Sequence, residues 1–273
     1  PAPLSPREPK LVIRAIGVES FADRALQAIP RARRDVEKLA EFLRSPDGQS
    51  HFSEGSIDSQ TLTDPDASRV TAVFDDLARQ VRDGDLKAGD TVFVVLESHL
   101  FRTDAGGSLI LAADSTSRAP DDYAAPASTL SERLEEVASQ GCLVVVLVDA
   151  IHPGASSAAG PAFKEWARDL YRKRGVFVLA ASKSEPSMRL DEHGAFALAV
   201  MSATTVAGGA AAVGVAEPPM TLDAFRRGVI NRVAELTSRR QFADFYPPET
   251  FSGWRQVHIF EPQPAPGDDL VSR

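Results

Sequence analysis

The chain contains very little cysteine and no recognisable metal-binding pattern. A single cysteine, Cys142, occurs among 273 residues, which excludes an internal disulfide framework and a cysteine-based metal site. The five histidines show no paired spacing that would indicate a histidine-based metal site. We therefore expect neither a metal nor another cofactor.

Common nucleotide-binding and catalytic motifs are also missing. The first predicted strand is followed by a lone glycine, Gly17, so the chain has neither a P-loop nor a dinucleotide-binding fingerprint. No Gly-x-Ser-x-Gly elbow occurs, which argues against an α/β-hydrolase. No internal repeat is visible.

Positive charge and membrane signals are scarce as well. The net charge of -8 argues against nucleic acid or an anionic membrane as the main partner. The stretch 195–216 is apolar, but its glycines and threonines and its few large aliphatic residues predict a buried helix and a turn rather than a membrane span. The N-terminal residues lack a basic segment followed by an apolar one, so we expect no signal peptide and a cytoplasmic protein.

Proline-rich segments lie at both ends of the chain. Residues 1–10 and 262–273 are predicted to be extended linkers that flank one domain, residues 11–261. Because the sequence begins with Pro1 rather than methionine, we expect it to belong to a longer protein. The hydrophobic fraction of 43% and the charged fraction of 25% are typical of a globular domain.

Two short apolar runs mark the centre of a predicted sheet. Residues 91–96 and 143–147 are almost continuously β-branched or aliphatic, which is typical of strands buried on both faces of a parallel sheet. The first run ends in Glu97-Ser98-His99, and the second ends in Asp149. Ligands and catalytic groups collect beyond the carboxyl ends of strands in open α/β sheets. We therefore expect both ends to form one functional edge.

The remaining periodicities predict an α/β fold, because strand patterns alternate with amphipathic helix patterns. Further strands are predicted at 11–18, 56–62 and 175–182, with a hairpin at 104–114 and a closing edge strand at 246–249 and 257–260. Helices are predicted at 32–43, 68–81, 130–138, 162–173, 197–207 and 224–236.

The two strand ends resemble the signatures of caspase-like peptidases, the family of caspases, metacaspases and bacterial orthocaspases. In that family, one strand ends in Ser-Gly-His-Gly and supplies the base. A later strand ends in Asp-(Ala/Ser)-Cys-(His/Gln)-(Ser/Ala)-Gly and supplies the nucleophile, roughly 50 residues after the histidine. Here residues 97–100 are Glu-Ser-His-Leu, and residues 149–154 are Asp-Ala-Ile-His-Pro-Gly. The resemblance covers nearly the whole chain and implies a caspase-like three-layer α/β/α sandwich with a mostly parallel central sheet.

The sequence departs from this family at the nucleophile position. His99 occupies the base position, and Ile151 replaces the catalytic cysteine. A caspase-like peptidase attacks with a thiolate activated by histidine, whereas isoleucine has neither a lone pair nor an ionisable proton. Leu100 replaces the glycine at the oxyanion-hole position, although its backbone N–H can still serve there. The chain is therefore predicted to be a pseudo-peptidase.

Two acidic positions near these signatures allow more than one interpretation. Asp149 matches the residue that helps bind a basic P1 side chain in metacaspase-like members, so the resemblance implies a pocket for Arg or Lys. Asp149 can equally be a structural residue that accepts backbone N–H groups at the strand end. The pair Arg34-Asp35 lies where the family has an Asn-Asp or similar pair, and we interpret it as a solvated helical turn.

None of the other nearby residues replaces the missing nucleophile. Cys142 lies at the opposite end of its strand from position 151 and is predicted to be a buried core thiol. Ser156 and Ser157 lack the sequence context of an activated serine, and we assign His152 no catalytic role.

Two functions are compatible with these observations. The first is a catalytically inactive binding, regulatory or scaffolding module, whose partner is a protein or peptide such as an active homologue or another domain of a longer chain. The second is a cysteine endopeptidase with Arg/Lys or Asp specificity whose nucleophile is lost in this copy or replaced by a nearby residue. We favour the first, because Ile151 and Leu100 depart from the family together.

Overall fold

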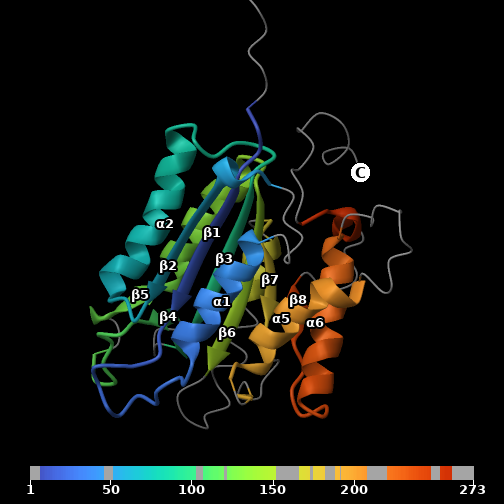
Figure 1. Cartoon of the computed structure of the whole chain (residues 1–273). Helices are drawn as coiled ribbons and strands as arrows, with labels where there is room; N and C mark the ends of the chain where they lie inside the picture. The colour runs from blue at the N-terminus through green and yellow to red at the C-terminus, as the bar shows by residue number, and fades with distance from the viewer. Residues whose placement is uncertain are drawn as a thin grey trace, which may run out of the picture.

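The computed structural model describes residues 7–45, 52–102, 107–119, 122–151, 166–172, 175–181, 188–190, 192–207, 220–246 and 253–259. Within these residues the strands form one mixed sheet, whose main path follows the order β2-β1-β3-β6-β7-β8 (Figure 1). These strands are β1 (Leu11–Gly17), β2 (Ile57–Thr63), β3 (Thr91–Arg102), β6 (Leu143–Ile151), β7 (Phe177–Ala180) and β8 (Asp244–Tyr246). All neighbouring pairs are parallel except β7 and β8.

A small antiparallel extension projects from the end of β3. The strand β4 (Ser108–Leu111) pairs with the last residues of β3, and β5 (Ala124–Pro126) pairs with β4. The predicted hairpin at 104–114 is therefore present as a strand that pairs with the end of β3, although residues 103–106 lie outside the described part.

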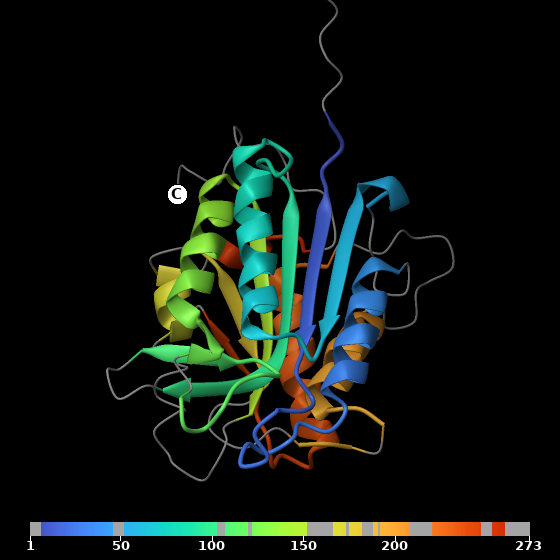
Figure 2. The same cartoon turned by 90° about the vertical axis from the view of Figure 1, so that its left-hand side faces the viewer.

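Helices cover both faces of the sheet (Figure 2). On one face, α2 (Ala67–Arg82) and α3 (Ala127–Ser139) pack against the strands. On the other face lie α1 (Ala32–Arg44), α5 (Ala195–Ala207) and α6 (Leu222–Leu236). The protein is therefore a three-layer α/β/α sandwich with a mostly parallel sheet, as predicted.

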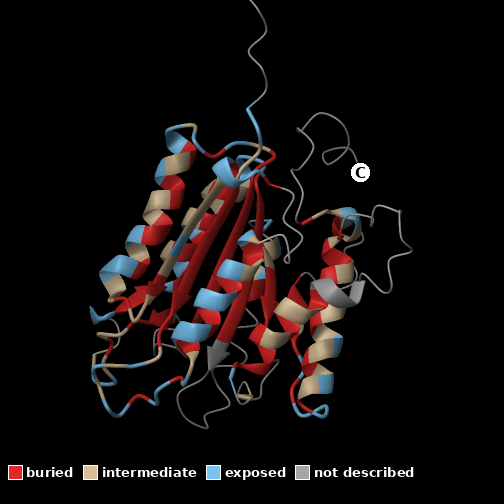
Figure 3. Cartoon of the chain, viewed as in Figure 1, coloured by how far each residue is buried: buried red, intermediate tan, exposed pale blue. Residues whose placement is uncertain are grey.

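The central strands are apolar at nearly every position because both of their faces are buried (Figure 3). In β1, Val12 and Ile16 pack on the side of α2, whereas Leu11 and Ile13 pack on the side of α1. Alternate residues of a strand point to opposite faces, so a strand between two helical layers needs apolar side chains at successive positions. This explains the continuous apolar runs in the sequence.

Side-chain caps begin two of the helices. The carboxylate of Asp66 accepts a hydrogen bond from the Arg69 backbone N–H at 2.8 Å at the start of α2. The hydroxyl of Thr221 accepts one from the Ala224 N–H at 3.2 Å at the start of α6. These caps satisfy backbone donors that have no partner within the helix. The first of these helices begins one residue, and the second two residues, before the predicted start.

Two features of the C-terminal third differ from the prediction. The edge strand β8 lies at Asp244–Tyr246 and shares Tyr246 with the predicted closing strand, of which residues 247–249 and 260 lie outside the described part. Residues Gly253–Gln256 form a short 3₁₀ helix. His258 forms an isolated bridge with Thr221. Among the described helices, none has the length and apolarity needed to cross a membrane.

Candidate functional site

The carboxyl ends of β3 and β6 lie side by side, as the sequence predicts. Glu97 pairs with Asp149 in the parallel register of these strands, and His99 pairs with Ile151. Both strands extend further than their apolar runs, so these residues belong to the strands instead of following them. The predicted base position and nucleophile position are therefore neighbours at this edge.

His99 is held firmly within the protein interior. Its side chain is completely buried, and its ring stacks on Phe21 with 5.1 Å between the ring centroids and 18° between the ring planes. Its Nε2 lies 2.6 Å from the backbone carbonyl oxygen of Gln27. A carbonyl oxygen only accepts hydrogen bonds, so Nε2 carries the proton and donates it. This nitrogen is committed to a structural hydrogen bond.

The side chain of Leu100 belongs to the hydrophobic core. It pairs with Ile110 in the antiparallel ladder between β3 and β4, and its side chain is buried on the side of α2 and α3. Residues two apart in a strand share a face, so Leu100 lies on the opposite face of β3 from Glu97 and His99. This places the side chain of Leu100 in the core, and the predicted role of its backbone N–H stays a prediction.

A buried acidic cluster lies at this edge on the side of α1 and α5. It consists of Asp35 from α1, Glu97 from β3 and Asp149 from β6, whose side chains are 0%, 3% and 5% exposed. All three carboxylates converge on one atom, Nη1 of Arg189. This atom lies 3.2 Å from Asp35 Oδ2 and 3.8 Å from Asp149 Oδ2, and it also contacts Glu97 Oε1.

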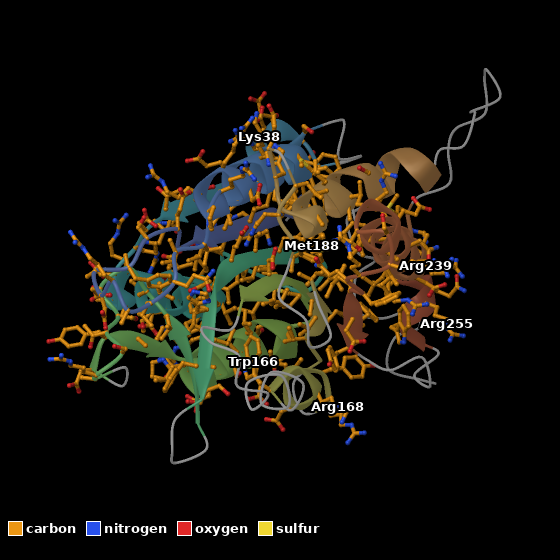
Figure 4. All side chains as sticks on the ribbon, turned by 90° about the horizontal axis from the view of Figure 1, so that it is seen from below. Lys38, Trp166, Arg168, Met188, Arg239 and Arg255 are labelled. Carbon is orange, nitrogen blue, oxygen red and sulfur yellow. The ribbon has the colours of Figure 1, made fainter. Side chains whose placement is uncertain are left out.

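The segment that precedes α5 delivers Arg189 to the cluster. An antiparallel bridge joins Arg189 to Gly194, and the Leu190 N–H donates to the His193 carbonyl at 2.9 Å. We call the paired residues 188–190 and 192–194 the hairpin. Figure 4 looks onto this end of the molecule and places Met188 near the middle of the face. Met188 is anchored by its N–H, which donates to Gln241 Oε1 at 2.6 Å.

Asp35 attaches this hairpin to the first helix. Its Oδ1 lies 2.6 Å from His193 Nδ1, and its Oδ2 accepts a hydrogen bond from the Gly194 N–H at 2.8 Å. The N-cap residue of α1, Arg31, donates from its guanidinium to the Leu190 carbonyl oxygen. The interpretation of Asp35 as part of a solvated turn was therefore wrong, because the hairpin covers it completely.

Burial and mutual repulsion set the protonation of the cluster. The pKa of Glu97 is raised well above its ordinary value, chiefly by burial and then by the negative charge of Asp149, while Arg189 opposes the shift. Burial disfavours the charge of Arg189, but the surrounding carboxylates outweigh that effect and raise the pKa of its guanidinium. Arg189 is therefore a permanent cation, whereas Glu97 tends to hold a proton.

Cys142 lies far from this edge. It immediately precedes β6, whereas Ile151 is the last residue of that strand, and a strand rises about 3.3 Å per residue. Its side chain is buried and its Sγ donates to the Lys87 carbonyl oxygen at 3.2 Å. Burial raises the pKa of this thiol from 9.0 to about 12. The prediction of a buried core thiol is confirmed, and Cys142 cannot supply a thiolate to the edge.

The sequence located part of this site and missed the rest. His99, Ile151 and Asp149 come together at the predicted edge. The sequence analysis did not single out Arg189 or His193. For Asp35, the signal that could have identified it is its match to the acidic residue of the pair that the caspase-like family has at the start of this helix. The predicted features at His152, Ser156 and Ser157 lie outside the described residues.

The cluster binds a cation that the chain itself supplies. In the described part of the chain, no three His, Cys, Asp or Glu side chains are grouped as metal ligands. The cluster instead holds a guanidinium, for which carboxylates are the preferred partners.

Comparisons with known proteins support the fold and leave the activity open. No protein-family model and no curated protein sequence matches the chain. The chain is similar to the crystal structure of protein GSU0716 from Geobacter sulfurreducens, with a TM-score of 0.59 and 13% sequence identity over 94% of this chain and 100% of that one. At this identity the similarity shows a shared α/β fold and nothing about function.

Proposed function

We propose that this protein is a catalytically inactive caspase-like domain that acts as a binding, regulatory or scaffolding module. The observation that carries the proposal is the register pair of His99 and Ile151 at the carboxyl ends of adjacent strands. By resemblance to the caspase-like peptidases, these are the positions of the base and the nucleophile, and an isoleucine there cannot form an acyl-enzyme.

The environment of His99 leaves the nucleophile position as the feature that decides. A general base needs a ring nitrogen that can accept a proton from the nucleophile. The Nε2 atom of His99 donates to the Gln27 carbonyl, so in the neutral ring Nδ1 is the nitrogen that can accept a proton. The proposal therefore rests on the nucleophile position, because Ile151 offers no proton for His99 to accept.

The alternative is a cysteine endopeptidase of Arg/Lys or Asp specificity whose nucleophile has been lost or replaced. The burial and the raised pKa of Cys142 argue against replacement by this thiol. No other described feature favours this alternative. The partner of the inactive module is then a protein or peptide, such as an active homologue or another domain.

The proposal is tested by assaying the chain and its Ile151→Cys variant with fluorogenic peptides that end in Arg, Lys or Asp. We expect no turnover by the unmodified chain. A matched His99→Ala/Ile151→Cys double variant reports whether any restored turnover depends on the histidine. Turnover by the unmodified chain would refute the proposal, and its sensitivity to a thiol reagent would then show whether Cys142 is responsible.

A further inference from the structure

The strand β2 is an open edge of the sheet. It stands first in the strand order, and among the described strands it pairs with β1 alone (Figure 2). Its residues are half-buried or exposed except for Leu62, whereas every residue of β1 is buried. An edge strand carries backbone N–H and C=O groups without a strand partner, so another strand can add to it.

The hydrogen bonds at the end of β2 show which of its backbone groups face outward. The N–H of Asp64, directly after the strand, donates to the Gly17 carbonyl oxygen of β1 at 2.8 Å. In a parallel ladder, every second residue of a strand directs its backbone groups to the same neighbour. The even-numbered residues of β2 therefore bond to β1, whereas the odd-numbered ones, among them Ser59 and Thr61, direct their N–H and C=O groups away from the sheet.

A cavity of about 480 Å³ opens along this edge between β2 and α2. Asp58 and Leu62 line it from β2, and Arg69 and Asp76 line it from α2. Because α2 returns the chain between two parallel strands, it runs antiparallel to β2. Asp58 lies beside Asp76, since both accept a hydrogen bond from Nε2 of Gln80. Arg69 lies about 10 Å further along the helix, toward Leu62.

The two ends of this cavity carry opposite charges that are not fully used within the chain. Asp58 Oδ2 accepts hydrogen bonds from Arg14 Nη2 at 2.6 Å and from Gln80 Nε2 at 3.3 Å, but Oδ1 has no partner among the described residues. Burial raises the pKa of Asp58, but the hydrogen bond and the charge of Arg14 outweigh this effect and lower it, so the carboxylate is ionised at neutral pH. The exposed guanidinium of Arg69 forms no ion pair or hydrogen bond within the described part of the chain.

The middle of β2 is marked by Gln60, the exposed residue of this strand. Gln60 lies halfway between Asp58 and Leu62 and shares their face of the strand. Its side-chain amide has no partner in the described ranges, and an amide, which is both donor and acceptor, can pair with an identical amide. The unused carboxylate oxygen and the unused cation thus lie on opposite sides of a self-complementary group. A twofold axis at Gln60 requires this arrangement.

We propose that β2 is a self-association surface, on which β2 of a second copy of this chain pairs antiparallel about a twofold axis at Gln60. In this register Ser59 of one copy lies opposite Thr61 of the other, and the two residues exchange hydrogen bonds through their outward-facing N–H and C=O groups. The sheets of the two copies then form one continuous sheet.

The same register completes the cavity. Asp58 of one copy lies opposite Leu62 of the second copy, so Arg69 of the second copy lies within reach of the free carboxylate oxygen. The axis forms this contact twice. The inference goes beyond the proposed function, because β2 is separated from β6 by β1 and β3 and its pairing does not depend on catalytic activity.

Sedimentation velocity of the full chain, at concentrations between about 1 and about 300 µM, measures the monomer–dimer equilibrium. Thr61→Pro removes an outward N–H and keeps the ladder to β1, because an edge strand tolerates proline where its N–H faces solvent. Arg69→Glu reverses the charge opposite Asp58 and lies in the first turn of α2, where an acidic residue is favourable. Arg82→Glu is the matched control, since Arg82 is 56% exposed on the same helix and does not line the cavity.

We expect the unmodified chain to dimerise as its concentration rises. Arg69→Glu should weaken dimerisation at least tenfold, because both symmetric contacts become repulsive, and Thr61→Pro should abolish it. Arg82→Glu should behave like the unmodified chain. Adding Asp58→Asn to Arg69→Glu should recover part of the lost affinity, because the repulsion between the two carboxylates disappears.

Oxidation of Gln60→Cys tests the register itself. Cβ atoms directly opposite each other in an antiparallel pair lie about 4.5–5.5 Å apart, close to the separation of about 3.5–4.5 Å in a disulfide. The two copies should therefore be joined by a disulfide. Thr63→Cys is the control, because Thr63 lies opposite Ile57 in this register, and the native Cys142 is buried. This comparison decides the matter if Thr61→Pro does not fold.

The inference is overturned if the unmodified chain stays monomeric throughout, or if Thr61→Pro and Arg69→Glu dimerise as well as it does, which would place the contact on another surface. Equal cross-linking of Gln60→Cys and Thr63→Cys would contradict the register. These results are independent of the peptidase assay. Absence of the dimer would leave the inactive-domain proposal standing, and turnover by the unmodified chain would refute that proposal without affecting the dimer.

Discussion

Glu97 of β3 and Asp149 of β6 are register partners on adjacent parallel strands, and both contact Nη1 of Arg189. Two carboxylates in such positions repel each other, and one guanidinium offsets that repulsion only in part. The two residues therefore connect the protonation of the buried cluster to the stability of the whole domain.

The first prediction concerns the pH dependence of stability. The pKa of Glu97 is raised well above 4.5 in the native state by burial and by Asp149. Protonated Glu97 therefore stabilises the native state fully below pH 4.5, and this stabilisation is lost as the pH rises from 4.5 through the native pKa. In Glu97→Gln this loss is absent. We expect the variant to gain stability relative to the unmodified chain above pH 4.5, by up to about 1.4 kcal/mol per pH unit until native Glu97 ionises.

The measurement is the free energy of unfolding in urea between pH 5 and 8. Glu192→Gln is the control, because Glu192 lies on the same hairpin but is 71% exposed, and its curve should follow that of the unmodified chain. Parallel curves for Glu97→Gln and the unmodified chain would contradict the assignment.

The second prediction concerns the reactivity of Cys142. With a pKa of about 12, only about one thiol in ten thousand is ionised at pH 8, and the side chain is buried. We expect Ellman's reagent to label the native protein only as fast as it unfolds, and to label it immediately in denaturant. Rapid labelling of the native protein at pH 8 would show that the thiol is accessible.

The central strands could be predicted because burial on two faces imposes an apolar residue at each position. The full lengths of these strands could not be predicted, because the backbone pairing continues beyond the last residue of each apolar run. β3 continues to Arg102 since Leu100, Phe101 and Arg102 pair with β4, and β6 continues to Ile151 since it pairs with His99.

The buried cluster was harder to predict, because its members come from distant parts of the sequence. Asp35 lies in the first turn of an amphipathic helix, where an acidic residue is favourable and usually solvated. It is buried only because Arg189, His193 and Gly194 fold over it from more than 150 residues away. Helical periodicity contains no information about such a contact, so the local pattern predicted an exposed residue.

The third prediction tests the close contact between β1 and α1. A Cβ at Gly17 would lie 2.6 Å from the Ala32 carbonyl oxygen and 2.7 Å from Val36 Cγ2, whereas a Cβ at Gly55 would meet nothing within 4 Å. Gly17→Ala should therefore lower the free energy of unfolding by about 1–3 kcal/mol. Gly55→Ala is the matched control and should change it by less than about 0.5 kcal/mol. Equal effects would mean that the helix shifts freely away from the strand.

The last prediction concerns the structural role of His99. Replacement by alanine removes a completely buried ring, its stacking on Phe21 and the donor to the Gln27 carbonyl. We expect His99→Ala to lower the free energy of unfolding by about 3 kcal/mol, since both a cavity and an unpaired carbonyl remain. Phe21→Leu keeps an apolar side chain over the histidine and should cost about 1 kcal/mol.

Urea denaturation of both variants measures these differences, with the exposed position Tyr123→Ala as a control that should change stability by less than about 0.5 kcal/mol. A loss below 1 kcal/mol for His99→Ala would contradict the structural role, because a ring fixed by stacking and a buried hydrogen bond cannot be removed so cheaply. A loss near 3 kcal/mol would instead explain why a histidine persists beside Ile151 without a nucleophile to activate.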